Sequence, residues 1–175
     1  MYKKLFFLLW ILIFLTIPIA RTKEDLWHRD GWLALYNTHT GKFLKINYLN
    51  IDGSVDPLAL DVISYHLRCP YTQECAVLDH RLLSLLDQIQ DYFGKEKTIS
   101  VISAYRSPMY NKKLRANSEK VAKYSYHLKA KAIDFRIEGI NLEDINAYAN
   151  VLHQGGVGYY PKKFVHIDVG PVRFW

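Results

Sequence analysis

The sequence predicts an α+β fold, and three observations support this class. Segments in which apolar residues alternate with polar ones, typical of strands, occur near both ends of the chain. Segments with apolar residues every three or four positions, typical of helices, lie between them without regular strand and helix alternation, which argues against a doubly wound sheet. The 175 residues, half of them hydrophobic, are enough for one core and leave little chain for a second.

The N-terminal segment differs in kind from the rest of the chain. Two lysines in "MYKK" precede "LFFLLWILIFLTIPIA", a run of sixteen apolar or weakly polar residues. This combination is typical of an export signal, and the run is somewhat short for a membrane span. We therefore expect residues 1–22 to be a signal peptide or an uncleaved membrane anchor. Residues 23–175 would then form a single exported domain in the periplasm or cell envelope, with inner-membrane anchoring as the second option.

The first half of this domain predicts a hairpin followed by two helices. "GWLALYNTHTGKFLKINYL" reads as two alternating strands around a turn at Thr38 to Gly41. In "SVDPLALDVISYHLR", Asp56 is suited to cap a helix whose first turn contains Pro57. "LDHRLLSLLDQIQDYF" repeats leucine and isoleucine at helical spacing, and Gly94 follows as its end.

The second half alternates shorter elements. "KTISVISAY" predicts a strand, and a short helix is expected to begin at Pro108. "NLEDINAYANVL" predicts a helix capped by Asn141, and "KFVHIDVG" predicts the last strand. Between them, the glycines of "HQGGVGYYP" are expected to serve backbone turns.

The net charge and the two cysteines indicate which partners and which cellular compartment suit the protein. The formal charge of +6 and the isoelectric point near 9.2 suit an anionic polymer or a lipid surface, but no dense basic run interleaves with aromatics, so nucleic acid is not expected. In an oxidising compartment, Cys69 and Cys75 of "RCPYTQEC" predict a local disulfide. Two buried thiols are the alternative, and this spacing alone is weak evidence for a metal.

Two strands carry candidate metal ligands. Alternation along "KAKAIDF" places Ala132 and Asp134 on one face, with His127 just upstream in a turn. In "KFVHIDVG", His166 and Asp168 share a face. Two histidines and a carboxylate on neighbouring strands would form a three-ligand zinc site with the fourth position open, as in catalytic zinc. The alternative is a pair of structural histidines satisfied by hydrogen bonds.

Four segments together resemble a known family. "SAYRSPMYN", "VAKYSYHLKAKAIDF", "GGVGYYP" and "FVHIDVGPVRFW" are similar to the signature blocks of exported peptidase M15-like proteins of the DUF882 or YcbK type, relatives of zinc D-Ala-D-Ala peptidases. The resemblance implies a hedgehog/D-Ala-D-Ala peptidase fold, with an antiparallel sheet and flanking helices. It also implies zinc on His127, Asp134 and His166. The chain departs from the pattern at Ala104 and Ala130, where glycines are usual.

The same resemblance assigns Arg106 of "SAYRS" to the arginine that meets the substrate. A guanidinium beside zinc can hold a peptide carboxylate or share the negative charge of a tetrahedral intermediate. The alternative is an arginine paired with a structural carboxylate, either Asp134 or Asp168.

The resemblance indicates the general base less directly than it indicates the zinc ligands. In the D-Ala-D-Ala dipeptidase branch a glutamate precedes the last zinc histidine by three residues, and Lys163 occupies that position here. We expect Asp168 to take its place, accepting a proton and passing it to the leaving amine. The alternative role for Asp168 is to orient a zinc histidine.

These observations predict an exported zinc metallopeptidase that hydrolyses peptide bonds of peptidoglycan stem peptides or cross-links. The competing hypothesis comes from a different class, a non-catalytic cell-wall binding protein on the same fold. The missing glutamate and the two alanines in place of glycines keep this second hypothesis open.

Overall fold

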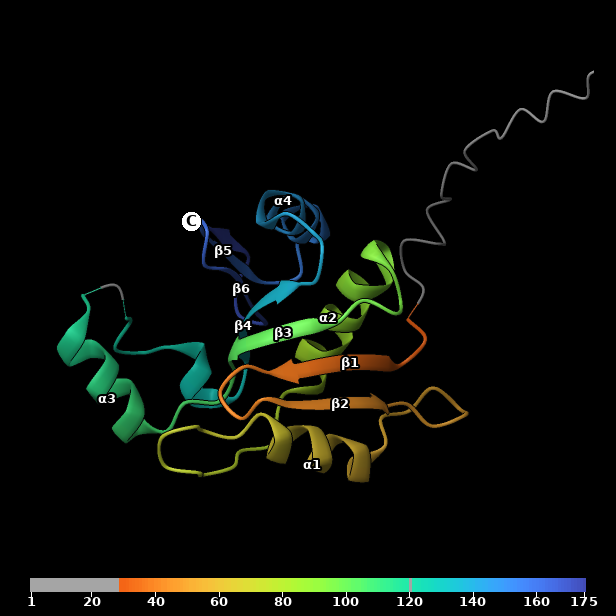
Figure 1. Ribbon diagram of the computed structural model, residues 1–175, viewed down its shortest axis with the longest axis horizontal. Helices are drawn as coiled ribbons and strands as arrows, with labels where there is room; N and C mark the ends of the chain where they lie inside the picture. The colour runs from red at the N-terminus through yellow and green to blue at the C-terminus, as the bar shows by residue number, and fades with distance from the viewer. Residues whose placement is uncertain (1–28, 120) are drawn as a thin grey trace, which may run out of the picture.

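The computed structural model describes residues 29–119 and 121–175 (Figure 1). The predicted signal or anchor at residues 1–22 lies outside the described residues. The strands are β1 Trp32–Asn37, β2 Lys42–Asn47, β3 Ile99–Ser103, β4 Ala132–Ile137, β5 Gly156–Tyr160, β6 Phe164–Asp168 and β7 Arg173–Phe174. The helices are α1 Pro57–His66, α2 His80–Phe93, α3 Pro108–Asn117, α4 Leu142–Leu152 and the 3-10 helix η2 Tyr126–Lys129. In this part of the chain, none of the helices has the length and apolar character needed to cross a membrane.

The strands form one seven-stranded sheet in the order β2-β1-β3-β4-β6-β5-β7. The α+β class is confirmed, whereas the expectation of an antiparallel sheet needs correction. β1 pairs with β3 in parallel, and so does β5 with β7, while the other four pairings are antiparallel. The chain between β1 and β3 passes through β2, α1 and α2, and such a long connection allows the chain to return in the same direction.

The two faces of the sheet have different roles. One face is apolar and packs against α2 and α4, of which α2 contacts β1 and β4 and α4 contacts β4, β5 and β6 (Figure 1). Its fully buried residues include Leu35 of β1, Phe135 of β4 and Ile167 of β6. The opposite face carries Asp134 and His166, as the alternation in the sequence predicts. The core therefore lies on one side of the sheet and the candidate site on the other.

The ends of the helices confirm most of the predicted caps. Asp56 accepts a hydrogen bond from the backbone N–H of Leu58, and Pro57 opens α1. Gly94 ends α2 with a φ of 137°, a conformation that residues with a side chain rarely adopt. Asn141 precedes α4 as predicted, but its side chain makes no capping hydrogen bond.

The predicted hairpin is confirmed, and its turn ends at Gly41, whose backbone N–H donates to Asn37. The predicted disulfide is wrong, because both cysteines are free. Cys69 is fully buried and its thiol donates to the hydroxyl of Ser107 at 3.4 Å, whereas Cys75 is exposed. The loop therefore directs the two thiols into different environments.

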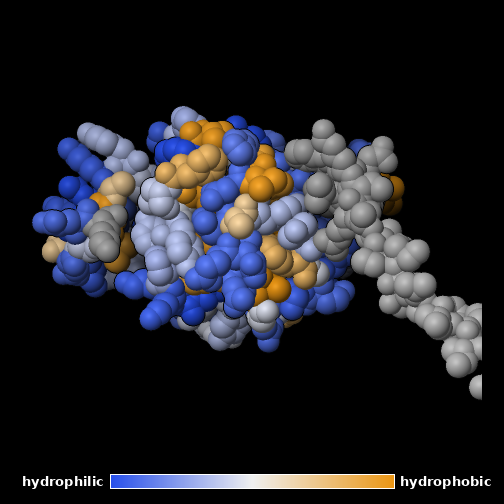
Figure 2. All heavy atoms as spheres, turned by 90° about the horizontal axis from the view of Figure 1, so that it is seen from above, coloured by the Kyte–Doolittle hydropathy of each residue, from blue (hydrophilic) through white to orange (hydrophobic). Residues whose placement is uncertain are grey.

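The outer surface is mixed in character. In the view of Figure 2, apolar side chains occur in small groups separated by polar ones. Such scattered exposure is common on folded domains.

Candidate metal centre

His127 is positioned by a short 3-10 helix that precedes β4. Ser125 caps this helix, and its hydroxyl accepts a hydrogen bond from the backbone N–H of His127 at 3.3 Å. The helix ends at Ala130, which has the left-handed φ of 53°. Glycine adopts this conformation at no steric cost, which explains why the family pattern usually has glycine here. Ala130 keeps the turn, and His127 is 2% exposed.

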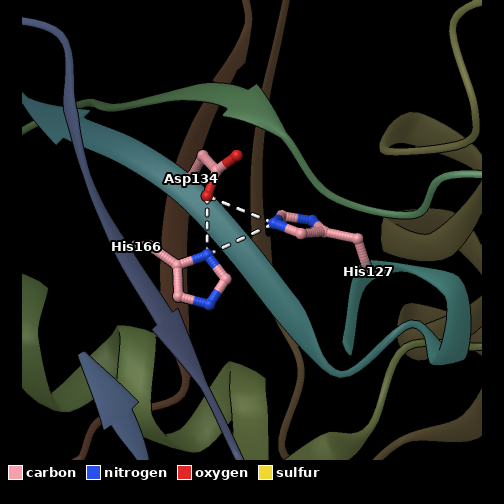
Figure 3. Close-up of side chains that lie close together, drawn as sticks. All are labelled: His127, Asp134 and His166. Atoms are coloured by element: carbon pink, nitrogen blue, oxygen red, sulfur yellow. Dashed lines mark hydrogen bonds and ion pairs between the residues drawn. The ribbon is translucent and has the colours of Figure 1, made fainter. Parts of the chain in front are cut away.

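Asp134 and His166 are brought together by strand pairing. They are directly opposite each other in the antiparallel register of β4 and β6, so their side chains emerge side by side on the same face. Figure 3 shows that the imidazole of His127 approaches both of them from the segment before β4. The three candidate ligands predicted from the sequence therefore meet, and all three are buried.

The distances within this cluster suit a tetrahedral metal. The Nε2 atom of His127 lies 3.2 Å from Oδ1 of Asp134 and 3.3 Å from Nδ1 of His166. Ligands of tetrahedral zinc, with bonds near 2.0–2.1 Å, are separated by roughly 3.3–3.4 Å. The third separation, from Nδ1 of His166 to Oδ1 of Asp134, is 2.7 Å and corresponds to a hydrogen bond. A cation would replace the shared proton of that pair.

The outer nitrogen of each histidine is held by an acceptor. Nδ1 of His127 lies 2.7 Å from the carbonyl oxygen of Ala104, and Nε2 of His166 lies 3.0 Å from Oδ2 of Asp168. Because a carbonyl or carboxylate oxygen only accepts, each outer nitrogen carries the proton. The inner nitrogens then face Asp134, as around histidines that bind metals, and a metal would displace the proton that His166 shares with Asp134.

The charges of the cluster follow from burial and proximity. Burial lowers the pKa of His127, which favours the neutral ring. Burial opposes ionisation of Asp134, but interactions with His127 and His166 outweigh it and hold its pKa far below the usual range. Burial would also lower the pKa of His166, but its hydrogen bonds to Asp134 and Asp168 raise it. His127 and Asp134 are therefore in the forms that bind a metal, a neutral imidazole and an ionised carboxylate, whereas His166 would release a proton on binding it.

Arg106 is the direct partner of Asp134. Its Nη2 atom donates to Oδ2 of Asp134 at 2.5 Å, and its Nε atom donates to the hydroxyl of Ser103 at 2.7 Å. This is the pairing with a structural carboxylate that the sequence allowed as an alternative. The pair uses Oδ2 and leaves Oδ1 turned to the two histidines. Arg106 also lines the adjoining cleft.

Asp168 is fully buried and accepts several hydrogen bonds. Besides His166, it accepts hydrogen bonds from both terminal nitrogens of Arg173, at 3.1 and 2.6 Å, and from the backbone N–H groups of Gly156 and Gly170. It lies at Nε2 of His166, whereas Asp134 faces Nδ1. This placement favours the orienting role over the predicted role as general base.

A cleft of about 560 Å³ lies in front of the cluster, and His127, Asp134 and His166 line it. Its other walls are largely aromatic and basic, including Tyr124, Tyr126, Tyr160, Lys163, Arg173 and Trp175. The candidate metal ligands therefore face a space large enough for several residues of a peptide.

Two contributors to this cleft were not singled out from the sequence. Arg173 binds Asp168, and the ring centroid of Trp175 lies 5.3 Å from that of His166. Within the final block "FVHIDVGPVRFW", no local spacing links either residue to the ligands. Their positions depend on β7, which pairs with β5 and returns the end of the chain to the site.

Two glycines of "GGVGYYP" lie in a strand and not in the predicted turn, whereas Gly155 lies in the bend before it. Gly156 and Gly158 lie within β5, opposite Asp168 and His166. A Cβ atom at Gly158 would lie 2.6 Å from the ring of Trp175, and one at Gly156 would lie 2.5 Å from the carboxylate of Asp168. These glycines therefore make room for the residues around His166. Their spacing of two, with both on one strand face, is the sequence signal for this role.

The fold and this site define a candidate metal-dependent hydrolase, with two histidines and an aspartate at one side of a peptide-sized cleft. Residues 28–175 match the model of the Peptidase_M15_2 family, described as peptidoglycan L,D-endopeptidase MepK. The chain belongs to this family, which confirms the predicted resemblance.

Named relatives agree with this assignment. The chain is 41% identical over 148 residues to the peptidoglycan L,D-endopeptidase MepK of Escherichia coli (strain K12), covering 84% of this chain and 81% of the relative. The protein of the same name from Shigella flexneri gives the same values. The probable peptidoglycan L,D-endopeptidase MepK of Haemophilus influenzae is 40% identical over 145 residues, covering 82% and 77%. No solved structure matches the chain, and the hedgehog/D-Ala-D-Ala type of fold stays a prediction.

Proposed function

We propose that this protein is an envelope zinc peptidase that hydrolyses a peptide bond between an L- and a D-residue in peptidoglycan cross-links. The observation that carries this proposal is the orientation of the two histidines. Their outer nitrogens are bound to acceptors, and their inner nitrogens converge on Oδ1 of Asp134 beside the cleft. The name of the relatives supports the substrate class and favours an enzyme over a non-catalytic wall-binding protein.

The donor set favours zinc among the divalent cations. Two imidazole nitrogens and one carboxylate oxygen are common zinc ligands, whereas calcium and magnesium prefer oxygen. In this proposal His127, Asp134 and His166 hold the ion. When bound, zinc polarises a carbonyl and lowers the pKa of a water molecule, the two effects that peptide hydrolysis requires.

The remaining residues would hold this arrangement and complement its charge. Arg106 fixes Asp134 through Oδ2, and its position along the cleft places a cation near the negative charge that develops on a scissile carbonyl. Asp168, itself held by Arg173, fixes the ring of His166 and keeps its proton on Nε2. We therefore assign Asp168 to positioning.

The test is digestion of isolated peptidoglycan by the full-length protein, with zinc and with a chelator, followed by mass spectrometry of the released muropeptides. With zinc, we expect the cross-linked muropeptides to disappear. The chelator should prevent this hydrolysis, and adding zinc back should restore it. The His166→Ala variant should be inactive, whereas His80→Ala, at an exposed histidine that begins α2, should be active. A folded, zinc-loaded protein that leaves every cross-link intact would refute the proposal.

A further inference from the structure

The cationic side chains of the cleft differ in whether an acidic residue is paired with them. Arg106 is paired with Asp134, and Arg173 is paired with Asp168. Lys163 also lines the cleft, but no hydrogen bond or ion pair joins its ammonium group to any residue in the described ranges. Each arginine thus has a carboxylate partner, whereas the positive charge of Lys163 has none in the described residues.

The backbone of Lys163 is held firmly although its side chain is exposed. Its N–H donates to the carbonyl of Tyr160 at 2.9 Å, which closes the turn between β5 and β6. Its carbonyl accepts from Nε of Arg136, and Nη2 of Arg136 also reaches the carbonyl of Lys162. The side chain therefore starts from a fixed point, which reduces the entropy lost when its ammonium group binds a ligand.

The turn also places Lys163 in the cleft that adjoins the candidate metal centre. It lies three residues before His166, directly before β6, and both residues line the same cleft. Next to it, the rings of Tyr160 and Phe164 are 4.6 Å apart and form an aromatic wall. A ligand bound in the cleft would meet an ammonium group beside apolar surface, so part of its hydration would be removed and its attraction for anions strengthened.

We propose that Lys163 forms a carboxylate-binding subsite for a stem peptide of the substrate, a proposal that rests on the function proposed above. Stem peptides carry free carboxylates because their glutamate is linked through its side chain and their diamino acid has two carboxyl groups. A lysine ammonium binds such a group as a point charge on a flexible stem. Lys163 thus selects substrates with an ionised carboxylate near the scissile bond.

The experiment uses the full-length protein and matched cross-linked muropeptides. One substrate has all its carboxylates, a second has a carboxamide on the diamino acid, and a third has a carboxamide on the glutamate. Lys163→Met removes the charge and retains the length of the side chain. Lys162→Met is the matched control, because this neighbouring lysine is in the same turn and does not line the cleft.

For the unmodified substrate, we expect Lys163→Met to raise KM about tenfold with little change in kcat, and Lys163→Arg to restore most of the loss. One of the two carboxamide substrates should raise the KM of the parent protein by the same factor. If Lys163→Met does not raise the KM for that substrate any further, the carboxylate that it lacks is the one that Lys163 binds. Lys162→Met should behave as the parent does on every substrate.

If Lys163→Met raised KM equally for all three substrates, or for none of them, the proposal would be overturned. Calorimetry of muropeptide binding by the same variants separates this result from failure of the proposed function. If the parent cleaves no substrate, the proposed peptidase activity fails, but a carboxylate-dependent difference in Kd between the parent and Lys163→Met would still support the subsite. Identical Kd values would overturn it.

Discussion

Two clusters of potential metal ligands occur in the described residues, and they differ in what surrounds them. One consists of His127, Asp134 and His166, and the other of Asp30, Asp87 and Asp91. In each cluster the ligand atoms lie within 4.8 Å of one another. Proximity alone therefore does not distinguish a metal centre from a structural group of carboxylates.

The surroundings of the carboxylate cluster point to a structural role. Oδ2 of Asp87 accepts hydrogen bonds from the backbone N–H of Gly31 at 3.1 Å and from the hydroxyl of Tyr48 at 2.9 Å. Lys95 supplies a cation 2.9 Å from Asp30. These contacts join the start of β1 and the end of β2 to α2. In the histidine cluster, by contrast, the outer hydrogen bonds turn the ligand atoms toward one another and the cleft adjoins them.

This comparison predicts that the first cluster determines activity and the second determines stability. The largest effect is expected for His166→Ala, which removes one of three ligands and should lower the rate of cross-link hydrolysis at least about a thousandfold. Assays of muropeptide release, with circular dichroism to verify folding, would measure it. Asp87→Asn is the control in the other cluster and should keep the activity of the parent. Loss of activity in both variants would remove the distinction.

The second prediction concerns the pH dependence of stability. Burial raises the pKa of Asp87 to about 7 from an ordinary value of 3.8, so the folded protein binds a proton that the unfolded chain has released. The penalty for ionising Asp87 is absent below pH 4, grows as the pH rises toward 7 and is complete above it. Asp87→Asn removes this penalty. Between pH 5 and pH 8, the free energy of unfolding of the variant should therefore rise relative to that of the parent by about 2–3 kcal/mol.

Urea unfolding at the two pH values would measure this difference. Asn can take over the hydrogen bond from Tyr48 or Gly31 without the charge, which makes it a close replacement. A difference between variant and parent that is the same at pH 5 and pH 8 would show that Asp87 does not titrate in this range.

A third, smaller effect is expected at the residue that orients His166. Asp168→Asn keeps the shape of the side chain but weakens its bonds to His166 and Arg173, so zinc affinity or activity should fall about ten- to a hundredfold. Competition with a chromogenic chelator would measure the zinc affinity. If Asp168 were instead the general base, activity would fall while zinc affinity stayed unchanged.

The smallest effect is expected for Lys95→Met. The side chain of Lys95 is half exposed, and its ion pairs with Asp30 and Asp91 are screened by solvent. We expect a loss of at most about 1 kcal/mol in the free energy of unfolding, measured with urea at low salt, and no change in activity. A loss of several kcal/mol would mean that the carboxylate cluster depends on this cation more than its exposure suggests.

Much of the site could be predicted because strand alternation is a local property. The pattern in "KFVHIDVG" placed His166 and Asp168 together on the face opposite the core, and the structure has them there. The role of Asp168 could not be predicted in this way. It depends on which nitrogen of His166 the carboxylate meets and on Arg173, and both are set by the pairing of β5 with β6 and β7.

The sequence by itself determined most of the elements, though not β5 or β7, together with the helix caps at Asp56 and Gly94 and the residue types that could bind zinc. Periodicity and capping act over a few neighbouring residues, which is why these features could be predicted. Only the tertiary structure decided the parallel pairing of β1 with β3, the pairing of Arg106 with Asp134 and the return of Trp175 to His166. These contacts join residues far apart in the chain. Their geometry arises from strand register and packing, which local periodicity does not encode.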